Sequence, residues 1–249
     1  MRCEFTLGHY REILRSAIDA EYTIVGFHSE AVDREGRHTL YLRHDIDVCI
    51  EEALPMARVE AELGIPSTYF LIVDSPAYNI LSADSVEMVG EIRRLGHWVG
   101  LHVDAAAVST FGAERIEEWV EKLLSLYGDL LHLVRVVSFH RPSPEVLNRG
   151  FAGFVSAYES RFLQEIKYIS ESRGSWREAC PCQAIRDGQF RAVQLLVHPV
   201  WWSASPRETL DVRLEHLLSA RSKETRSYLA KNITPLRELL TGKASGDSR

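Results

Sequence analysis

The sequence predicts an α/β fold built on a parallel sheet. Short apolar runs of strand length alternate along the chain with longer segments of helical periodicity, which is the pattern of successive β-α-β units. The 249 residues, 45% of them hydrophobic, suffice for one large domain with a substantial core. These observations leave open whether the sheet closes as a barrel or is doubly wound.

The N-terminal half alternates from its first residues, starting with an amphipathic pattern and a buried strand pattern. Helices are expected over 5–20, over 49–63 before Gly64 and Pro66, and from a cap at Ser82 or Ser85 to Leu95; strands are expected over 22–27, 39–44, 67–73 and 97–102.

The C-terminal half continues the pattern with one gap, at 143–166, where no clean period predicts an element. A helix is expected over 112–127, strands over 133–140, 167–170 and 192–198, and a last helix from Pro206 to Asn232. A flexible tail over 236–249 is expected to follow.

Charge and composition exclude several classes of function. The net charge is -6 and both signs are interspersed, so no basic stripe suggests a nucleic-acid partner. No stretch approaches the roughly 20 apolar residues of a membrane helix, and charges occupy the first residues, so we expect a cytoplasmic protein without a membrane span. No GxGxxG or GxxxxGK motif supports dinucleotide or P-loop binding.

Four cysteines, Cys3, Cys49, Cys180 and Cys182, form no paired CxxC motifs. The CPC at 180–182 is too tight for a structural zinc site by itself. We therefore expect four reduced thiols.

The stretch YLRHDIDV, 41–48, carries three ionisable groups at the end of a strand pattern: His44, Asp45 and Asp47. Two carboxylates this close suit metal binding with proton transfer, because a cation removes the repulsion that would otherwise raise one pKa. The alternative is a surface turn in which the two aspartates cap the following helix.

Ionisable residues recur at the ends of other expected strands, where parallel α/β folds assemble their active sites. These residues are Asp45 and Asp47, His102 and Asp104, His140 and Arg141, Glu171, and His198. One carboxylate and two imidazoles can hold a divalent transition ion, a second carboxylate can deprotonate water, and a further histidine can protonate a leaving group. The sequence thus predicts metal-assisted hydrolysis.

Five motifs, in order, resemble those of the NodB-like polysaccharide deacetylases, especially a divergent RHD-x-D branch associated with surface-polysaccharide and O-antigen biosynthesis. The motifs are RHDID at 43–47, GHWVGLH at 96–102, SFHRP at 138–142, YISESRGSW at 168–176 and LLVHP at 195–199. The resemblance implies a single-domain deformed (β/α) barrel over 1–235.

The same resemblance implies roles for individual residues. Asp45 would be the general base, Asp47 and His102 metal ligands, His198 the general acid, Arg141 the residue that holds the base carboxylate, and Glu171 the partner of that arginine; Trp176, Trp201 and Trp202 would line the sugar-binding groove. The implied cofactor is zinc, with cobalt, nickel or iron as alternatives.

One departure from the family pattern concerns the second metal histidine, which the family places four residues after the first. That position is Ala106 here. His140 is the candidate replacement and Asp104 its competitor. If neither serves, the metal site is incomplete and the protein would bind a substrate without cleaving it.

We therefore expect a metal-dependent deacetylase that removes an N-acyl group, in the first instance acetyl, from a carbohydrate or nucleotide-sugar precursor. A non-catalytic carbohydrate-binding or assembly protein is the first alternative. A metal-dependent phosphohydrolase, prompted by the His44-Asp45 pair, is the second, and it would call for an all-helical domain. The sugar, the acyl group, the metal and the oligomeric state stay open.

Overall fold

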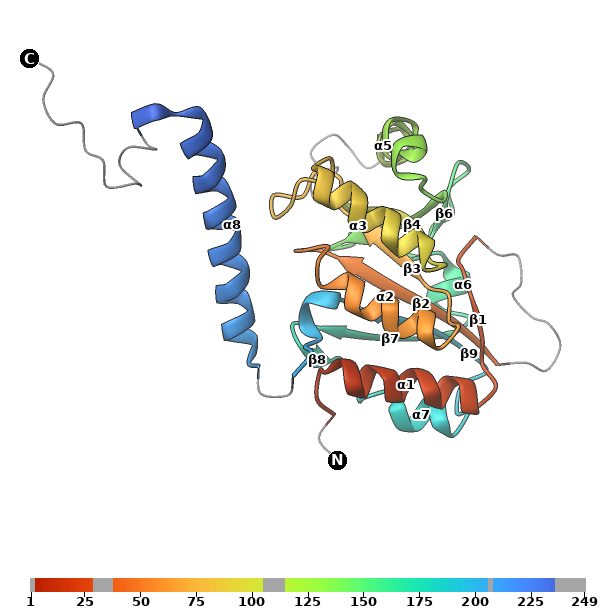
Figure 1. The fold of residues 1–249 in the computed structure, drawn as a ribbon. Coiled ribbons are helices and arrows are strands. Elements are labelled where there is room, and N and C mark those ends of the chain that lie inside the picture. The colour runs from red at the N-terminus through yellow and green to blue at the C-terminus, as the bar shows by residue number, and fades with distance from the viewer. Residues whose placement is uncertain (1–2, 29–37, 105–114, 206–207, 236–249) are drawn as a thin grey trace, which may run out of the picture. The chain divides into compact units, whose positions relative to one another are not determined.

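The computed structural model describes residues 3–28, 38–104, 115–205 and 208–235. The chain divides into two compact units, Met1–Ser205 and Pro206–Arg249. The first unit is the α/β domain (Figure 1), and the second contains the last helix, which the sequence predicts as part of a domain over 1–235.

Within the described residues one sheet has nine strands, in the order β6-β5-β4-β3-β2-β9-β7-β8, with β1 beside the first half of β2. Every pairing is parallel except that of β7 with β8. The strands are β1 (Thr23–Val25), β2 (Thr39–Ile46), β3 (Thr68–Leu71), β4 (Trp98–Asp104), β5 (Val136–His140), β6 (Val155–Ser156), β7 (Lys167–Ser172), β8 (Ser175–Trp176) and β9 (Ala192–Val197).

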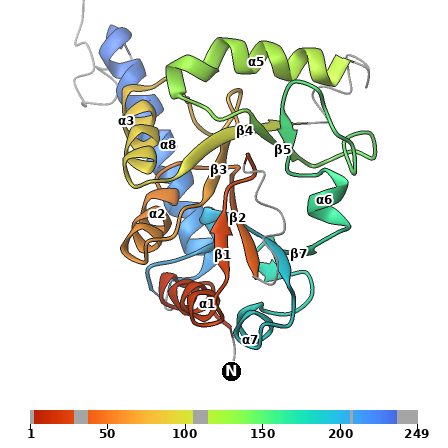
Figure 2. The same ribbon diagram turned by 90° about the vertical axis from the view of Figure 1, so that its right-hand side faces the viewer.

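Helices follow one another around the outside of this sheet (Figure 2). They are α1 (Leu7–Asp19), α2 (Ala53–Glu62), α3 (Ala83–Arg94), α5 (Ile116–Leu131), α6 (Ser160–Leu163) and α7 (Cys182–Arg186), with a 3-10 turn η2 (Pro199–Trp201) after β9. The Ser82 hydroxyl accepts a hydrogen bond from the Ser85 backbone N–H and so caps α3, as the sequence predicted.

The sheet is curled into a half-barrel. Two strands separate β2 from β5, which in a flat sheet would place them about 14 Å apart at roughly 4.8 Å per strand. Yet Oδ1 of Asp47, just after β2, lies 3.2 Å from Nδ1 of His140 at the end of β5. The predicted parallel α/β fold is confirmed at this level, and the curl is compatible with a deformed barrel.

Strand β2 crosses the middle of the domain and is buried along its whole length. Because side chains alternate, Tyr41, Arg43 and Asp45 share the inner face of the curl, while Leu42 and His44 face the helices. Below the polar residues the inner face is apolar: Tyr41 packs with Phe27, Phe70, Val136 and Phe162. This aromatic floor supports the polar site above it.

Gly100 on β4 permits the close packing of that floor. A Cβ there would lie 2.5 Å from the Val136 carbonyl oxygen and 2.9 Å from the Phe70 ring. The missing side chain therefore lets β4 bring His102, two residues further on the same face, against its neighbour β5.

The gap left at 143–166 contains β6 and α6, and the sequence reading also missed β8 and α7; all four elements are shorter than six residues, too short to show a period. The second unit holds the helix α8 (Leu210–Asn232), and the tail 236–249 lies outside the described residues. No helix of the described chain is long and apolar enough to cross a membrane.

Candidate metal centre and active site

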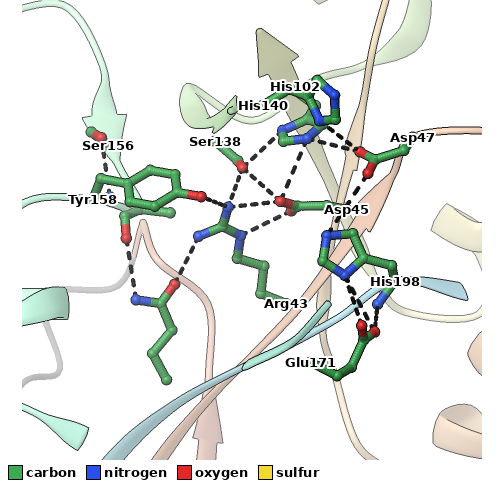
Figure 3. Close-up of polar contacts among 12 residues, drawn as sticks. Arg43, Asp45, Asp47, His102, Ser138, His140, Ser156, Tyr158, Glu171 and His198 are labelled. Carbon is green, nitrogen blue, oxygen red and sulfur yellow. Dashed lines mark hydrogen bonds and ion pairs between the residues drawn. The ribbon is translucent and has the colours of Figure 1, made fainter. Parts of the chain in front are cut away.

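The inner carboxyl ends of β2, β4 and β5, together with the residue after β9, bring one cluster of polar side chains together (Figure 3). They are Asp45 and Asp47 from β2 and its exit, His102 from β4, Ser138 and His140 from β5, and His198 after β9. The predicted convergence of strand ends is therefore present in the structure.

Arg43 binds the carboxylate of Asp45 through two hydrogen bonds. Its Nε donates to Oδ1 at 2.9 Å and its Nη2 to Oδ2 at 2.7 Å, and the two side chains are 0% and 2% exposed. Tyr158 and Gln194 accept further hydrogen bonds from the same guanidinium. Burial by itself would raise the pKa of Asp45, but the Arg43 charge outweighs it and keeps that pKa below its ordinary value.

Ser138 determines the tautomer of His102. Its hydroxyl donates its only proton to Asp45 Oδ2, at 3.1 Å, and accepts from Arg43. The contact of 2.9 Å between Ser138 Oγ and His102 Nδ1 must then be a hydrogen bond donated by the imidazole. In the neutral ring the lone pair is then on His102 Nε2, the atom that lies 3.1 Å from Asp47 Oδ1 and could bind an ion there, whereas in the protonated ring the same atom carries a proton toward Asp47.

Asp47, His102 and His140 form a group able to hold a metal ion, because one ligand atom from each lies within 4.8 Å of the others. His102 Nε2 and His140 Nδ1 lie 3.1 and 3.2 Å from Asp47 Oδ1. Ligands at about 2.1 Å from a tetrahedral ion would be roughly 3.4 Å apart, so little movement is needed.

Two buried atoms of this group support the metal interpretation. Asp47 Oδ1 and His102 Nε2 have no directed hydrogen bond within the described residues, although both are buried. Two imidazoles and one carboxylate are a ligand set suited to zinc and to cobalt, nickel or iron. The residues therefore fit a divalent transition ion.

The charges around Asp47 favour its ionised form. Burial alone would raise the pKa of Asp47, but His102 and His140 beside it hold that pKa well below its ordinary value. Asp47 in turn raises the pKa of His140. A cation would act on the carboxylate in the same direction as the two imidazoles.

His198 faces the group from the opposite side and is oriented by Glu171. Its Nδ1 lies 3.2 Å from Glu171 Oε2, its backbone N–H donates to the same carboxylate, and its Nε2 lies 3.9 Å from Asp47 Oδ2. Burial would lower the pKa of His198, but the Glu171 carboxylate outweighs it and raises that pKa to about 9. The imidazole can thus carry a proton on the side that faces Asp47.

Five of these ionisable side chains line one cavity of about 620 Å³. Its wall includes Asp45, Asp47, His102, His140 and His198 together with Tyr158, Tyr168 and Arg177. This volume is ample for a monosaccharide unit beside a metal ion.

No protein-family model matches the chain, and a comparison with curated proteins also yields no match. The function must therefore be argued from this site.

The predicted roles of Arg141 and Glu171 need correction. Arg141 is 64% exposed and pairs with Asp104, not with Asp45. Arg43 holds Asp45 instead, and Glu171 pairs with His198, not with an arginine. The physical reason is direction: Arg43 lies on the same strand face as Asp45, two residues away, whereas Arg141 lies beyond the end of β5.

Asp104 is likewise excluded from the group of three ligand atoms, because its carboxylate is turned to Arg141. His140 takes the position for which the two residues competed. Ala106 lies outside the described residues.

The three tryptophans do not line the cavity. Trp202 is 1% exposed and packs edge-on against Phe5 at 5.0 Å, and Trp176 stacks on Phe5 at 5.7 Å. Trp201 joins the same apolar cluster, which lies between the sheet and α1. None of the three predicted sugar-binding tryptophans lines this cavity; their rings pack instead against the N-terminal segment of the domain.

His44 belongs to a separate buried network on the outer face of β2. Its Nε2 lies 2.7 Å from Glu60 Oε1, and its ring stacks on Tyr69 at 4.2 Å. His44 and Asp45 therefore point to opposite faces of the strand and cannot act as a pair, which removes the observation that prompted the phosphohydrolase alternative.

Proposed function

We propose that this protein is a metal-dependent hydrolase that removes an N-acyl group, most simply acetyl, from a sugar or nucleotide-sugar precursor, in the manner of the NodB-like deacetylases. One observation carries the proposal. Asp47, His102 and His140 converge within 4.8 Å at the wall of a cavity that also contains a second carboxylate, Asp45, and an oriented imidazole, His198.

A divalent ion held by Asp47, His102 and His140 would supply Lewis acidity toward an amide carbonyl and a water molecule. Asp45 is the base that takes the proton of the attacking water. Its lowered pKa makes it a weak base, so it would depend on the Lewis acidity that a bound ion would supply to the water.

The proton for the departing amine comes from His198. Glu171 receives the Nδ1–H and raises the pKa of the ring to about 9, so the imidazolium is available near neutral pH. Arg43 and Ser138 hydrogen-bond the base Asp45, and Glu171 hydrogen-bonds the acid His198. This division of two proton-transfer roles is what amide hydrolysis requires.

The non-catalytic alternative was motivated by Ala106, where the family has its second metal histidine. His140 supplies an imidazole within reach of Asp47 and His102, which favours the hydrolase over a protein that only binds carbohydrate.

The test uses protein purified without chelator, reloaded with zinc or cobalt, and a panel of N-acetylated monosaccharides and nucleotide sugars, with release of acetate as the readout. Asp45→Asn should retain metal and lose at least about a hundredfold in kcat, because a general base is worth about that much or more. Acetate release by Asp45→Asn at the wild-type rate would exclude Asp45 as the base. Metal-loaded wild-type protein that binds these sugars without releasing acetate would instead support the binding protein.

A further inference from the structure

A second cluster of metal-binding side chains lies apart from the candidate active site. Cys3, His9, Cys180 and Cys182 each offer one ligand atom, and these four atoms all lie within 4.8 Å of one another. Three thiols and one imidazole are the ligand set of a structural tetrahedral zinc site. The four residues come from the two ends of the domain, 179 positions apart at the widest.

The distances suit such an ion. Zinc-thiolate bonds of about 2.3 Å in tetrahedral geometry separate two sulfurs by roughly 3.8 Å. Cys3 Sγ and Cys182 Sγ are 3.9 Å apart, and His9 Nε2 is 3.1 Å from Cys180 Sγ. The other ligand atoms lie within 4.8 Å of one another, so side-chain shifts of about 1 Å or less would complete the coordination.

His9 also has the second contact that metal-binding histidines usually have. Its Nδ1 lies 3.0 Å from Glu12 Oε2, one turn further along α1. A proton on Nδ1 leaves the Nε2 lone pair directed at the thiols, and a carboxylate in this position makes the imidazole a stronger ligand.

The position of the cluster in the fold gives it a structural purpose. Cys3 precedes α1, His9 lies in its first turn, and Cys180 and Cys182 lie at the start of α7, which packs beside α1 (Figure 1). All four residues are partly exposed, so an ion can enter from solvent.

We infer that Cys3, His9, Cys180 and Cys182 bind a structural Zn²⁺ ion that fastens the N-terminal segment to the start of α7. The CPC motif, too short to make a zinc site alone, becomes half of one when Cys3 and His9 complete it. This ion is distinct from the one proposed at Asp47, whose ligands include no thiolate.

The test exploits that difference. Apo protein, fully reduced, is titrated with cobalt, because a thiolate-to-cobalt charge-transfer band in the near ultraviolet reports the cysteine cluster alone, whether or not the Asp47 site is loaded. The wild type should show this band together with intense visible bands of tetrahedral cobalt, and zinc should abolish both. Cys180→Ser/Cys182→Ser should lose the charge-transfer band, whereas Cys49→Ala, the cysteine outside the cluster, should keep it.

A gentler variant guards against misfolding. Glu12 is 66% exposed at its side chain, so Glu12→Gln should fold normally yet bind cobalt about tenfold more weakly at the thiolate site. Unchanged affinity in Glu12→Gln would contradict the role of Glu12, and unchanged affinity in His9→Ala would remove His9 from the ligand set. A wild type without the band at saturating cobalt, or one that holds a Cys3–Cys182 disulfide under the same reducing conditions, would overturn the inference.

Discussion

Arg43, and not the predicted Arg141, binds the carboxylate of Asp45, and this pairing leads to a specific prediction about stability. Arg43→Met removes a guanidinium that is 0% exposed and leaves the Asp45 carboxylate, 2% exposed, without its counter-charge. Removing one partner of such a buried pair costs about 3 to 5 kcal/mol. We expect a loss near 4 kcal/mol at neutral pH, because Ser138 still donates one hydrogen bond to the carboxylate.

The loss should depend on pH with a definite sign. In the wild type the pKa of Asp45 is lowered, so its contribution to stability is present above the unfolded-state pKa and is lost as pH falls through the folded-state value. In Arg43→Met the guanidinium no longer opposes the effect of burial, so the pKa of Asp45 rises. At low pH the Asp45 carboxylate is then protonated, and the loss of stability in the variant becomes smaller. Arg43→Met/Asp45→Asn should recover part of the loss for the same reason.

The assay is urea unfolding followed by circular dichroism at several pH values, with Arg141→Met as the matched control. Arg141 is 64% exposed and pairs with Asp104 at the surface, so its removal should cost no more than about 1 kcal/mol. Equal losses in the two variants, or a larger loss in Arg141→Met, would refute the assignment of Arg43.

Three further predictions concern the site and its surroundings. Because Glu171 raises the pKa of His198 to about 9, the rate of turnover should fall as the pH rises and His198 loses its proton. A bound cation will place the midpoint of this fall below pH 9, and Glu171→Gln should move the midpoint lower still. An unchanged midpoint in Glu171→Gln would contradict the role of His198 as the acid. Ser138→Ala should weaken metal binding by about tenfold in competition with a chelator, since it frees the His102 ring, and wild-type affinity would count against that positioning role. Trp202→Ala should lower the free energy of unfolding by about 3 to 5 kcal/mol without changing the KM for a sugar; a raised KM in a stable variant would restore the predicted groove.

Much of the fold was readable from the sequence because its strands are short apolar runs that end on ionisable residues. The period of helix and strand located α1, α2 and the long strands to within a few residues. The curl of the sheet could not be predicted from the sequence, because it depends on strand twist and on packing between residues far apart in the chain, such as Gly100 and Phe70.

The sequence predicted which strand ends meet at the candidate site, but it did not predict which side chains pair with one another there. Asp47, His102 and His140 lie together as expected, whereas Arg141 pairs with Asp104 and the tryptophans pack in the apolar cluster beside α1. The alternation of side chains along a strand does indicate Arg43, because it places this residue on the same face as Asp45 and Asp47. Ser138 carries the same signal, two residues before His140. The cysteine cluster had no local signal, because Cys3 and Cys182 meet only through the packing of α1 on α7.

The most direct test of the central claim is the metal content of the group formed by Asp47, His102 and His140. Elemental mass spectrometry would compare the wild type with His140→Ala and with His216→Ala, a histidine on an exposed face of α8, all in the Cys180→Ser/Cys182→Ser background. The account predicts near-stoichiometric zinc, cobalt, nickel or iron in that background, retained in His216→Ala and lost in His140→Ala. Absence of metal after supplementation, or metal retained equally in both histidine variants, would contradict it.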